Sequence, residues 1–339
     1  MPLRIAQYGT GHGHAAGKAR AMLRSHEVDF AGVFEPDPRA LALAQRQAGL
    51  AGVRWLRSRE EFLGDPSVAA VAIEGRNDES LAMAGEAVEA GKHLWLDKPA
   101  GDDWPAFQRI AVVARDRGLL IQVGYMLRYH EGFRQIAEWA RSGLLGEVFA
   151  VRAHMSTNIP VERPDLPAGS RQSTGRHRGG IFYDLGAHML DQLVWLLGRP
   201  RRVQAFLRND ATPDLPTFAD NTLGVFEFDR SLAFVDIAAM EARPTARRFE
   251  VYGTRGSAIL EPFDPSRQIR LCLEEAREGY AAGEQHLPLG APSWQDLFER
   301  ELSALAATLK GDRPPDRSLD HELLVQETLL RATGAIPGG

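Results

Sequence analysis

The chain has 339 residues, of which 44% are hydrophobic and 25% are charged, and these proportions are typical of soluble globular proteins. A chain of this length is too long for one ordinary hydrophobic core and suits two domains. Its formal net charge of −5 argues against an electrostatic affinity for nucleic acids or anionic membranes. We therefore expect neither a nucleic acid nor a membrane as a partner.

The single cysteine, Cys272, cannot form an internal disulfide. A reducing, cytoplasmic location is therefore the simplest expectation. An apolar strand is expected from the third residue onward, so no secretory signal segment is predicted. No apolar run in the sequence is long enough to cross a bilayer.

The first motif is a glycine-rich turn between an expected strand and an expected helix. Leu3–Tyr8 has the apolar character of a short buried strand, and Gly9–His14 follows it directly. Good helix formers come next, and a second apolar run, Val28–Phe34, ends at Glu35. A strand, glycine turn, helix and strand that ends in a carboxylate is the arrangement that binds dinucleotides. N–H groups of the turn would bind the pyrophosphate, and Glu35 would bind the adenosine ribose.

The turn departs from the common glycine spacing in one place. With Gly9 and Gly11 as the first two glycines, His14 replaces the third small residue, whereas a register that starts at Gly11 reaches Ala16 but begins late. An ordinary tight turn with solvated histidines is the alternative, and two histidines without a third ligand do not predict a metal. We use the first register, in which the cofactor contacts come from Gly9, Thr10, Gly11, His12, Gly13 and His14.

The next segments continue the alternation of strands and helices to about residue 122. Further strands with helices between them are expected at Val53–Trp55, Val68–Ile73, His93–Leu96 and Leu119–Val123. Six parallel strands would complete a doubly wound dinucleotide-binding domain over residues 1–122. The fourth strand is followed by a loop at the carboxyl edge of the sheet, where such folds bind ligands. This loop contains Gly75, Arg76 and Asn77.

The segment Asp97-Lys98-Pro99 follows the fifth expected strand. Nearly all cations of the chain are arginines, and its only lysines are Lys18, Lys92, Lys98 and Lys310. A lysine, unlike an arginine, can lose its proton near neutral pH when its surroundings favour the neutral amine. Lys98 is therefore a candidate catalytic group, with a surface cation before a proline turn as the alternative.

The second domain is expected over residues 123–339. A helix at Glu131–Ser142 and a strand at Glu147–His154 precede a loop, residues 156–178, whose length is typical of functional or disordered loops. Six more strands follow at Arg202–Leu207, Asn221–Phe228, Leu232–Ala239, Arg248–Gly253, Ser257–Glu261 and Gln268–Leu273, and helices at Trp294–Lys310 and Leu319–Thr333 close the chain.

Short loops between these strands predict an open, mainly antiparallel sheet. One face of this sheet would pack on helices, and a second subunit is the obvious cover for the other face. The fold class is therefore α/β, with an N-terminal Rossmann doubly wound parallel sheet and a C-terminal α+β domain. We expect a homodimer or homotetramer that forms through the open sheet face.

A long apolar helix is expected over residues 179–198. Asp184, His188 and Asp191 are spaced i, i+4 and i+7, so they form a polar stripe on one face of this helix. Burial of such a stripe without partners would be costly, so it must face a cavity, a partner or a cofactor. The alternatives are a helix cap at Asp184, a satisfied core histidine at His188, and a metal held by all three residues.

Taken together, these stretches resemble the glucose–fructose oxidoreductase and inositol dehydrogenase family (Gfo/Idh/MocA) over nearly the whole chain. The resemblance depends on the order and spacing of several motifs: Gly9-x-Gly11, Asn77, Ala90-Gly91-Lys92-His93, Asp97-Lys98-Pro99, Gly124-x-x-x-Arg128-Tyr129, Gly179-Gly180-x-x-x-Asp184-x-Gly186-x-His188, Asp220-Asn221 and residues 251–257. It implies an enzyme that transfers a hydride between a nicotinamide cofactor and a hydroxyl or keto carbon of a sugar, polyol or related compound.

By the family's pattern, Lys98 would contact both the substrate hydroxyl and the cofactor ribose, while Asp184 and His188 would complete the proton path. An imidazole suits this work because its unperturbed pKa lies near neutrality. Asp184 would orient the imidazole, and which of Lys98 and His188 takes the proton stays open. The remaining cofactor contacts implied by the resemblance come from Gly75, Arg76, Asn77 and Asp97.

The chain departs from the family's pattern at several positions. Asp97 stands where the family usually has a glutamate, and Gly75-Arg76 stands where Thr-Pro is common. Arg76 would place a cation beside the cofactor or an acidic substrate, with a solvent-facing loop arginine as the alternative. Weaker candidates for the substrate site, with surface or ion-pair roles as the alternative, are Arg128, His154, Arg171, His177 and Arg178.

The expected cofactor is NAD rather than NADP. Glu35 and Asp37 oppose a 2′-phosphate by like charge, and Arg39 would only soften this preference. Two other classes of function stay open, namely a protein that senses NAD or a sugar without turnover and a metal-dependent lyase or hydrolase. Lys98 and His188 argue against the sensor, since a sensor has no need of a proton path.

Overall fold

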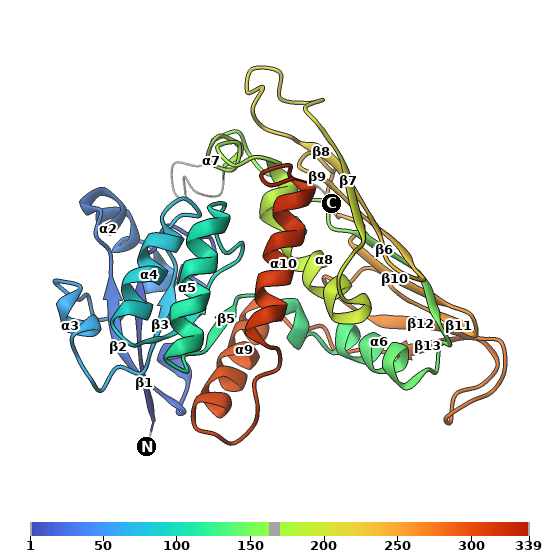
Figure 1. Cartoon of the computed structure of the whole chain (residues 1–339), viewed down its shortest axis with the longest axis horizontal. Helices are drawn as coiled ribbons and strands as arrows, with labels where there is room; N and C mark the ends of the chain where they lie inside the picture. Colours follow the sequence, from blue (N-terminus) through green and yellow to red (C-terminus); the bar gives the residue numbers. More distant parts are fainter. Residues whose placement is uncertain (1, 163–169, 338–339) are drawn as a thin grey trace. The chain divides into compact units, whose positions relative to one another are not determined.

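The computed structural model describes residues 2–162 and 170–337 (Figure 1). The chain forms two compact units. Unit 1 contains residues 2–125 and Trp294–Gln326, whereas unit 2 contains Met126–Val161, Arg171–Ser293 and residues 327–337. The boundary expected at residue 122 lies close to the observed change of unit. Residues 294–326, which the sequence analysis had assigned to the second domain, instead pack within unit 1.

Unit 1 is built on a parallel sheet with the strand order β2-β1-β3-β4-β5. The strands are β1 (Leu3–Tyr8), β2 (Val28–Phe34), β3 (Ala70–Ile73), β4 (His93–Leu96) and β5 (Ile121–Val123). The third of the six expected strands, Val53–Trp55, is wrong, because Trp55 forms only an isolated bridge with Val33. Two backbone hydrogen bonds, from Val33 N–H to Arg54 O and from Leu56 N–H to Val33 O, are too few to extend the sheet.

Helices connect the parallel strands of this sheet. The helix α1 lies between β1 and β2 in the chain, α4 between β3 and β4, and α5 between β4 and β5. Figure 1 shows α4 and α5 side by side on one face. The helical segments of unit 1 are α1 (Ala15–Arg24), α2 (Pro38–Ala44), η1 (Ala48–Leu50), α3 (Glu60–Leu63), α4 (Ser80–Glu89), α5 (Trp104–Asp116), α9 (Trp294–Leu309) and the first part of α10 (Leu319–Ala332).

The helix α9 joins unit 1 by packing closely on α1. Gly17 permits this approach, since a Cβ at this position would lie 2.6 Å from the ring of Phe298. The short helix α2 was not expected from the sequence, although it has a recognisable start. The carboxylate of Asp37 accepts a hydrogen bond from the N–H of Arg39 at 2.8 Å, and Pro38 occupies the first helical position.

Unit 2 contains an eight-stranded sheet with the order β13-β12-β11-β10-β6-β9-β8-β7. Among the described strand pairs of this eight-stranded sheet, only β6 and β9 are parallel. The expected open, mainly antiparallel sheet is therefore confirmed. The strands are β6 (Val148–His154), β7 (Arg202–Arg208), β8 (Asn221–Glu227), β9 (Leu232–Ala238), β10 (Arg248–Gly253), β11 (Gly256–Leu260), β12 (Gln268–Leu273) and β13 (Gly283–Pro288). The last of these was not predicted, because Gly283–Pro288 is rich in polar residues.

Helices α6 and α8 lie on one face of this sheet (Figure 1). Phe182 of α8 fills the space beside Gly224 of β8, where a Cβ would lie 2.7 Å from its ring. Exposed and buried residues alternate along β12, as expected for a strand with one solvated face. The helical segments of unit 2 are η2 (Met126–Tyr129), α6 (Glu131–Ser142), α7 (Arg171–Thr174), α8 (Ile181–Leu197) and the end of α10. No helix in the described part of the chain is long and apolar enough to cross a membrane.

Candidate functional site

The glycine turn lies at the carboxyl ends of β1 and β3. Gly9 has a φ of +89°, and a Cβ there would lie 2.5 Å from the backbone N of Gly75. A Cβ on Gly11 would lie 2.7 Å from Cγ of Arg76. Only glycine therefore lets the turn pack so closely against the Gly75–Arg76 loop. The helix α1 begins directly afterwards with His14 as its N-cap residue, so its first N–H groups lie at the turn.

Glu35, the expected ribose ligand, holds the glycine turn in place. Its Oε2 accepts hydrogen bonds from both the N–H and the hydroxyl of Thr10, each at 2.7 Å, while Oε1 accepts one from the N–H of Asp37 at 3.0 Å. The residue is 8% exposed. Because a carboxylate has about four acceptor positions, these three bonds leave capacity for a ribose hydroxyl.

Arg76 is bound by acids of its own loop. Its Nε lies 3.0 Å from Oδ1 of Asp78, and its Nη2 lies 2.7 Å from Oε1 of Glu79. Arg76 also interacts electrostatically with Asp37, and Glu79 interacts with Glu35. The guanidinium is therefore surrounded by carboxylates, which compete with any phosphate for it.

Five ionisable side chains form a buried cluster that we call the Lys18 cluster: Lys18 of α1, Glu74 after β3, Asp97 after β4, and His12 and His14 of the turn. The Nζ of Lys18 lies 2.8 Å from Oε1 of Glu74 and 3.0 Å from Oδ2 of Asp97. Nδ1 of His14 lies 3.1 Å from Oδ1 of Asp97, and Nδ1 of His12 lies 3.3 Å from Oδ2. The cluster thus connects the glycine turn, α1 and the ends of β3 and β4.

The charges of the Lys18 cluster change one another's protonation. Burial alone would lower the pKa of Lys18, but the carboxylates of Asp97 and Glu74 outweigh burial and raise it. Burial opposes ionisation of Asp97 as well, yet His12, His14 and Lys18 hold its pKa well below the usual range. Burial and the nearby Asp97 raise the pKa of Glu74 well above its usual range. Burial lowers the pKa of His14 to about 4, so this imidazole is neutral at pH 7.

His12, His14 and Asp97 also offer three ligand atoms within 4.8 Å of one another. Asp97 is thus the third group that the sequence analysis could not place beside the two histidines. The same carboxylate, however, already binds the Lys18 ammonium through Oδ2 and the N–H of Lys98 through Oδ1 at 2.7 Å. We therefore assign the cation of this cluster to the lysine rather than to a metal ion.

Lys98 follows this cluster directly in sequence, and its side chain is buried, with 3% of the residue exposed. It stands at the carboxyl end of β4, two strands away from the glycine turn that follows β1. The structure thus brings the glycine turn, the Gly75–Arg76 loop and the Asp97–Lys98 segment to one edge of the sheet. Ligands of open α/β sheets bind at this edge.

In unit 2 the polar stripe of α8 is divided between two environments. Asp191 is fully buried and accepts hydrogen bonds from Nε and Nη2 of Arg128 at 3.2 and 2.5 Å. The guanidinium of Arg128 lies 4.2 Å from the centre of the Trp195 ring. Asp191 is therefore one half of a buried ion pair, which weakens the idea of a metal held by three residues of this helix. His188 is fully buried, whereas Asp184 is partly exposed.

The weaker substrate candidates have partners within unit 2. His154 bridges two acids, with Nδ1 2.5 Å from Asp236 and Nε2 2.8 Å from Glu241. Arg171 donates hydrogen bonds to the carbonyls of Ile159 and Ala239 and to the hydroxyl of Thr212. The ring of His177 stacks on that of Tyr183, with ring centres 4.6 Å apart. Arg178 is exposed and lies beside Gly334. Their roles in substrate binding stay predictions.

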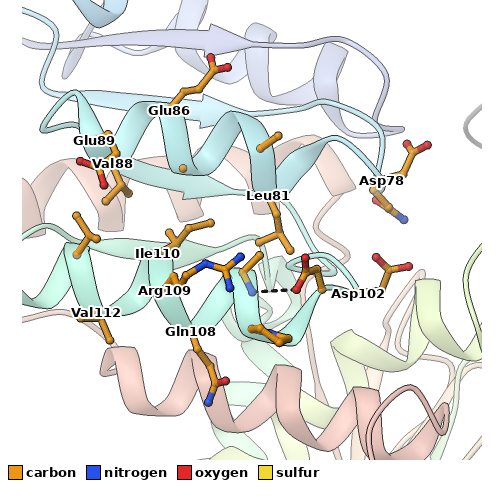
Figure 2. A pocket seen from close by; sticks show the side chains of 17 residues that line it. Asp78, Leu81, Glu86, Val88, Glu89, Asp102, Gln108, Arg109, Ile110 and Val112 are labelled. Atoms are coloured by element: carbon orange, nitrogen blue, oxygen red, sulfur yellow. Dashed lines mark hydrogen bonds between the residues drawn. The ribbon is translucent and has the colours of Figure 1, made fainter.

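A surface groove of about 1180 Å³ runs between α4 and α5 (Figure 2). The side chains of Leu81 and Ile110 lie between the two helices, and Asp78 and Asp102 stand at one end. Neither the glycine turn nor Lys98 lines it. This groove is therefore separate from the residues proposed for catalysis at the edge of the sheet.

Sequence reasoning missed Lys18 and Glu74, and it missed Glu301 of α9, which interacts electrostatically with Lys18 and Asp97. One signal was present in the sequence. The residues Ala15, Lys18, Ala19 and Met22 form the buried stripe of α1, so a lysine stands where an apolar residue is expected. A buried lysine requires acidic partners, although the sequence does not show which ones.

Comparisons with known proteins agree with this geometry. Residues 3–125 match the model of the oxidoreductase family with an NAD-binding Rossmann fold, and residues 133–259 match the model of the GFO/IDH/MocA C-terminal domain. The 1,5-anhydro-D-fructose reductase of Ensifer adhaerens is 25% identical over 258 residues, which are 76% of this chain and 74% of the relative. A dTDP-3,4-didehydro-2,6-dideoxy-alpha-D-glucose 3-reductase of Actinomadura kijaniata is 28% identical over 321 residues, which are 89% of each chain.

Other relatives are matched over a smaller share of their length. In two of them the match spans only 64% and 58% of the relative's own length. Among solved structures, biliverdin reductase from Synechocystis, in complex with biliverdin and NADP+, superposes with a TM-score of 0.75 over 99% of each chain. Its identity of 20% shows a shared fold alone. The two family models together cover most of the sequence, and the chain therefore belongs to the Gfo/Idh/MocA family of oxidoreductases with an NAD-binding Rossmann domain.

Proposed function

We propose that this protein transfers a hydride between a nicotinamide cofactor and a hydroxyl or keto carbon of a sugar, a polyol or a related small molecule. The observation that carries this proposal is the position of Lys98, which follows a carboxylate bonded to the glycine turn at the carboxyl edge of a Rossmann sheet. Two relatives are named as reductases of sugar derivatives, which supports a substrate of this class.

The residues around the glycine turn fit a dinucleotide. Gly9 and Gly11 leave no room for side chains that would cover the turn, and the N-terminus of α1 offers N–H groups and a positive dipole end to a pyrophosphate. When bound, the nicotinamide would accept or deliver the hydride. The cofactor residues stay as predicted from the sequence: Gly9, Thr10, Gly11, His12, Gly13, His14, Glu35, Gly75, Arg76, Asn77, Asp97 and Lys98.

The proton chemistry would come from this chain's own side chains. Lys98 would stabilise the negative charge that develops on the substrate oxygen, and His188 would take or return the hydroxyl proton. Asp184, one turn before His188 on α8, would orient the imidazole. These roles require α8 of unit 2 to meet the Asp97–Lys98 segment of unit 1, which stays a prediction.

We further infer a preference for NAD over NADP. Glu35, Asp37 and Glu79 interact with the Gly75–Arg76 loop or with the glycine turn, so a 2′-phosphate would meet several like charges. Arg76, the cation of the loop, is already bound by Asp78 and Glu79. Tighter binding of NADP(H) than of NAD(H) in a fluorescence titration would contradict this inference.

A second copy of the chain is the proposed cover for the open face of the unit 2 sheet. Phe206 and Leu232 on this face are 62% and 53% exposed. Large apolar side chains at this level of exposure favour a protein interface. The single cysteine, Cys272, lies exposed on β12 and fits a reducing compartment, so we place the protein in the cytoplasm.

The deciding experiment follows reduction of NAD over a panel of sugars, polyols and their acids. The wild type is expected to turn over at least one of them. Lys98→Met and His188→Ala should each lower kcat by about 10²- to 10⁴-fold, the range for loss of a positioned acid, base or charge. Tight NAD binding without turnover on the whole panel would favour the sensor, and loss of activity with a chelator would favour a metal-dependent reaction.

A further inference from the structure

We propose that Lys18 is a positioning residue, whose buried ammonium fixes the carboxylate of Asp97 and thereby the peptide that carries Lys98. The inference rests on the proposed function, in which Lys98 contacts the substrate. It assigns a role to a lysine that neither the motif analysis nor the resemblance to the family singles out.

The connection consists of two direct contacts. Nζ of Lys18 lies 3.0 Å from Oδ2 of Asp97, and the other oxygen of this carboxylate accepts the N–H of Lys98 at 2.7 Å. One rigid group of atoms thus links the ammonium of α1 to the backbone of Lys98. Both ends are closed to water, since Lys18 is 0% and Asp97 is 4% exposed. Electrostatic contacts of this kind are strong where water is excluded.

The surroundings of Lys18 leave it little freedom. Its ammonium also lies 2.8 Å from Oε1 of Glu74 and 4.4 Å from the centre of the Trp95 ring. A Cβ on Gly124 would lie 3.1 Å from Oδ1 of Asp97 and 3.2 Å from Nζ of Lys18. The ion pair therefore fills the space that a side chain at Gly124 would need, and its geometry is fixed from several sides.

Removal of the ammonium would leave Asp97 without the cation that contacts its Oδ2. Glu74, whose pKa is already raised by burial and by Asp97, would then hold a proton, and Asp97 would lose the contact that fixes its orientation beside the backbone of Lys98. The same carboxylate contacts His14 of the glycine turn at 3.1 Å, so its displacement would disturb both the turn and Lys98.

Lys92 offers the matched control. It is also a buried lysine of unit 1, 4% exposed, but its Nζ donates to the carbonyls of Asp65 and Val68 at 2.6 and 2.9 Å. It precedes β4, whereas Asp97 follows that strand. Lys92→Met thus removes a buried ammonium from the same unit without touching the Lys18 cluster.

The kinetic test compares Lys18→Met and the double variant Lys18→Met/Glu74→Gln with Lys92→Met. The double variant removes one acid together with the cation, so it should fold even where the single variant does not. We expect the double variant to lose at least about tenfold in kcat with the KM of the substrate within about threefold, because a small displacement of a reacting group is costly. Lys92→Met should keep the kcat of the wild type. A folded double variant with wild-type kcat would overturn the proposal.

A second measurement does not depend on turnover. The rate at which the Lys98 amine is acylated by a small reagent is read by peptide mass spectrometry, with Lys310 as the internal reference. In the double variant we expect Lys98 to react at least about threefold faster relative to Lys310, because its peptide is no longer held. An unchanged ratio overturns the proposal whatever the kinetics show. Suppose that the acylation rate of Lys98 relative to Lys310 rises in the double variant, while the wild type turns over no substrate of the panel. This result would support the positioning role of Lys18 and contradict the proposed function.

Discussion

A buried cation organises a polar cluster in each unit, but the balance of charge around the two cations differs. In unit 2, Arg128 pairs with the carboxylate of Asp191 and stacks against Trp195. In unit 1, Lys18 faces both Glu74 and Asp97 and interacts with Glu301 as well. In unit 2 the two nitrogens of one guanidinium contact one carboxylate, whereas in unit 1 two carboxylates contact one ammonium.

This difference separates a structural ion pair from one associated with a reactive site. The Arg128–Asp191 pair holds η2 against α8. In unit 1, burial first and the neighbouring Asp97 second raise the pKa values of Glu74 and Glu301, and such shifts cluster at functional sites. The excess in unit 1 lies beside the glycine turn and Lys98. Four predictions test this contrast, in order of decreasing effect.

The largest effect is expected when the ion pair of Arg128 and Asp191 is broken. Arg128→Met leaves the Asp191 carboxylate buried without its cation and should lower the free energy of unfolding by about 3–5 kcal/mol. The double variant Arg128→Met/Asp191→Leu should recover most of this loss, since it removes both charges. Urea unfolding followed by circular dichroism measures both variants. A single variant as stable as the wild type would show that the pair contributes little.

Removal of an excess acid should have the opposite sign. Burial raises the pKa of Glu301 from 4.5 to about 7, against the attraction of Lys18 and Arg317. A raised pKa means that the folded state binds the proton of Glu301 more tightly than the unfolded state does. The contribution of this bound proton to the free energy of unfolding is complete below pH 4.5 and is lost as the pH rises through 7. Glu301→Gln keeps a neutral side chain at every pH. It should therefore exceed the wild type in unfolding free energy by up to about 3 kcal/mol at pH 8, and by nothing below pH 4.5.

Unfolding of Glu301→Gln and the wild type at a series of pH values tests this sign. A variant that is less stable than the wild type at pH 8 would show that Glu301 is ionised and favourably paired. In that case unit 1 would have no excess of acid at this position, and the contrast with unit 2 would become smaller.

A third prediction concerns the acids at the glycine turn. Glu35→Gln removes a charge that opposes a 2′-phosphate, while its side-chain oxygen can still accept the hydrogen bonds of Thr10. We expect the Kd for NADPH to fall about tenfold, which corresponds to about 1.4 kcal/mol, with a smaller change for NADH. Fluorescence titration with both cofactors measures the ratio. An unchanged ratio would mean that this carboxylate serves only to fix the turn.

The smallest effect is expected for an ion pair outside both clusters. Arg115 and Asp320 form a salt bridge whose side chains are 56% and 79% exposed. Solvent screens such a pair, so Arg115→Ala should change the unfolding free energy by at most about 1 kcal/mol. A larger loss would show that pairing itself, rather than burial, gives the clusters their strength. Urea unfolding at two salt concentrations distinguishes these explanations.

The sequence predicted most of the elements that carry the site. The strands β1, β2 and β4 and the helix α6 agree with the expected ranges to within a residue, because their apolar periodicity is strong. The errors fall where the local signal was weak or ambiguous. Val53–Trp55 has strand-like residues but makes only one bridge, and the polar strand β13 shows no alternation of apolar residues.

The candidate site divides in the same way. Gly9, Gly11 and Lys98 are recognisable because each stands at a strand end with a distinctive neighbour, and these positions follow from the order of residues alone. The partners of Lys18 do not follow from that order, since Glu74, Asp97 and Glu301 are between 56 and 283 residues away from it. Even the third group beside His12 and His14 became apparent only with the fold.

The amino-acid sequence by itself determined the βα alternation and the glycine turn, because these properties depend on neighbouring residues. Only the tertiary structure decided that one ammonium would lie between carboxylates that follow two different strands. The physical reason is that the packing of α1 on the sheet brings these charges together, and only in that packed interior does their mutual distance fix their protonation.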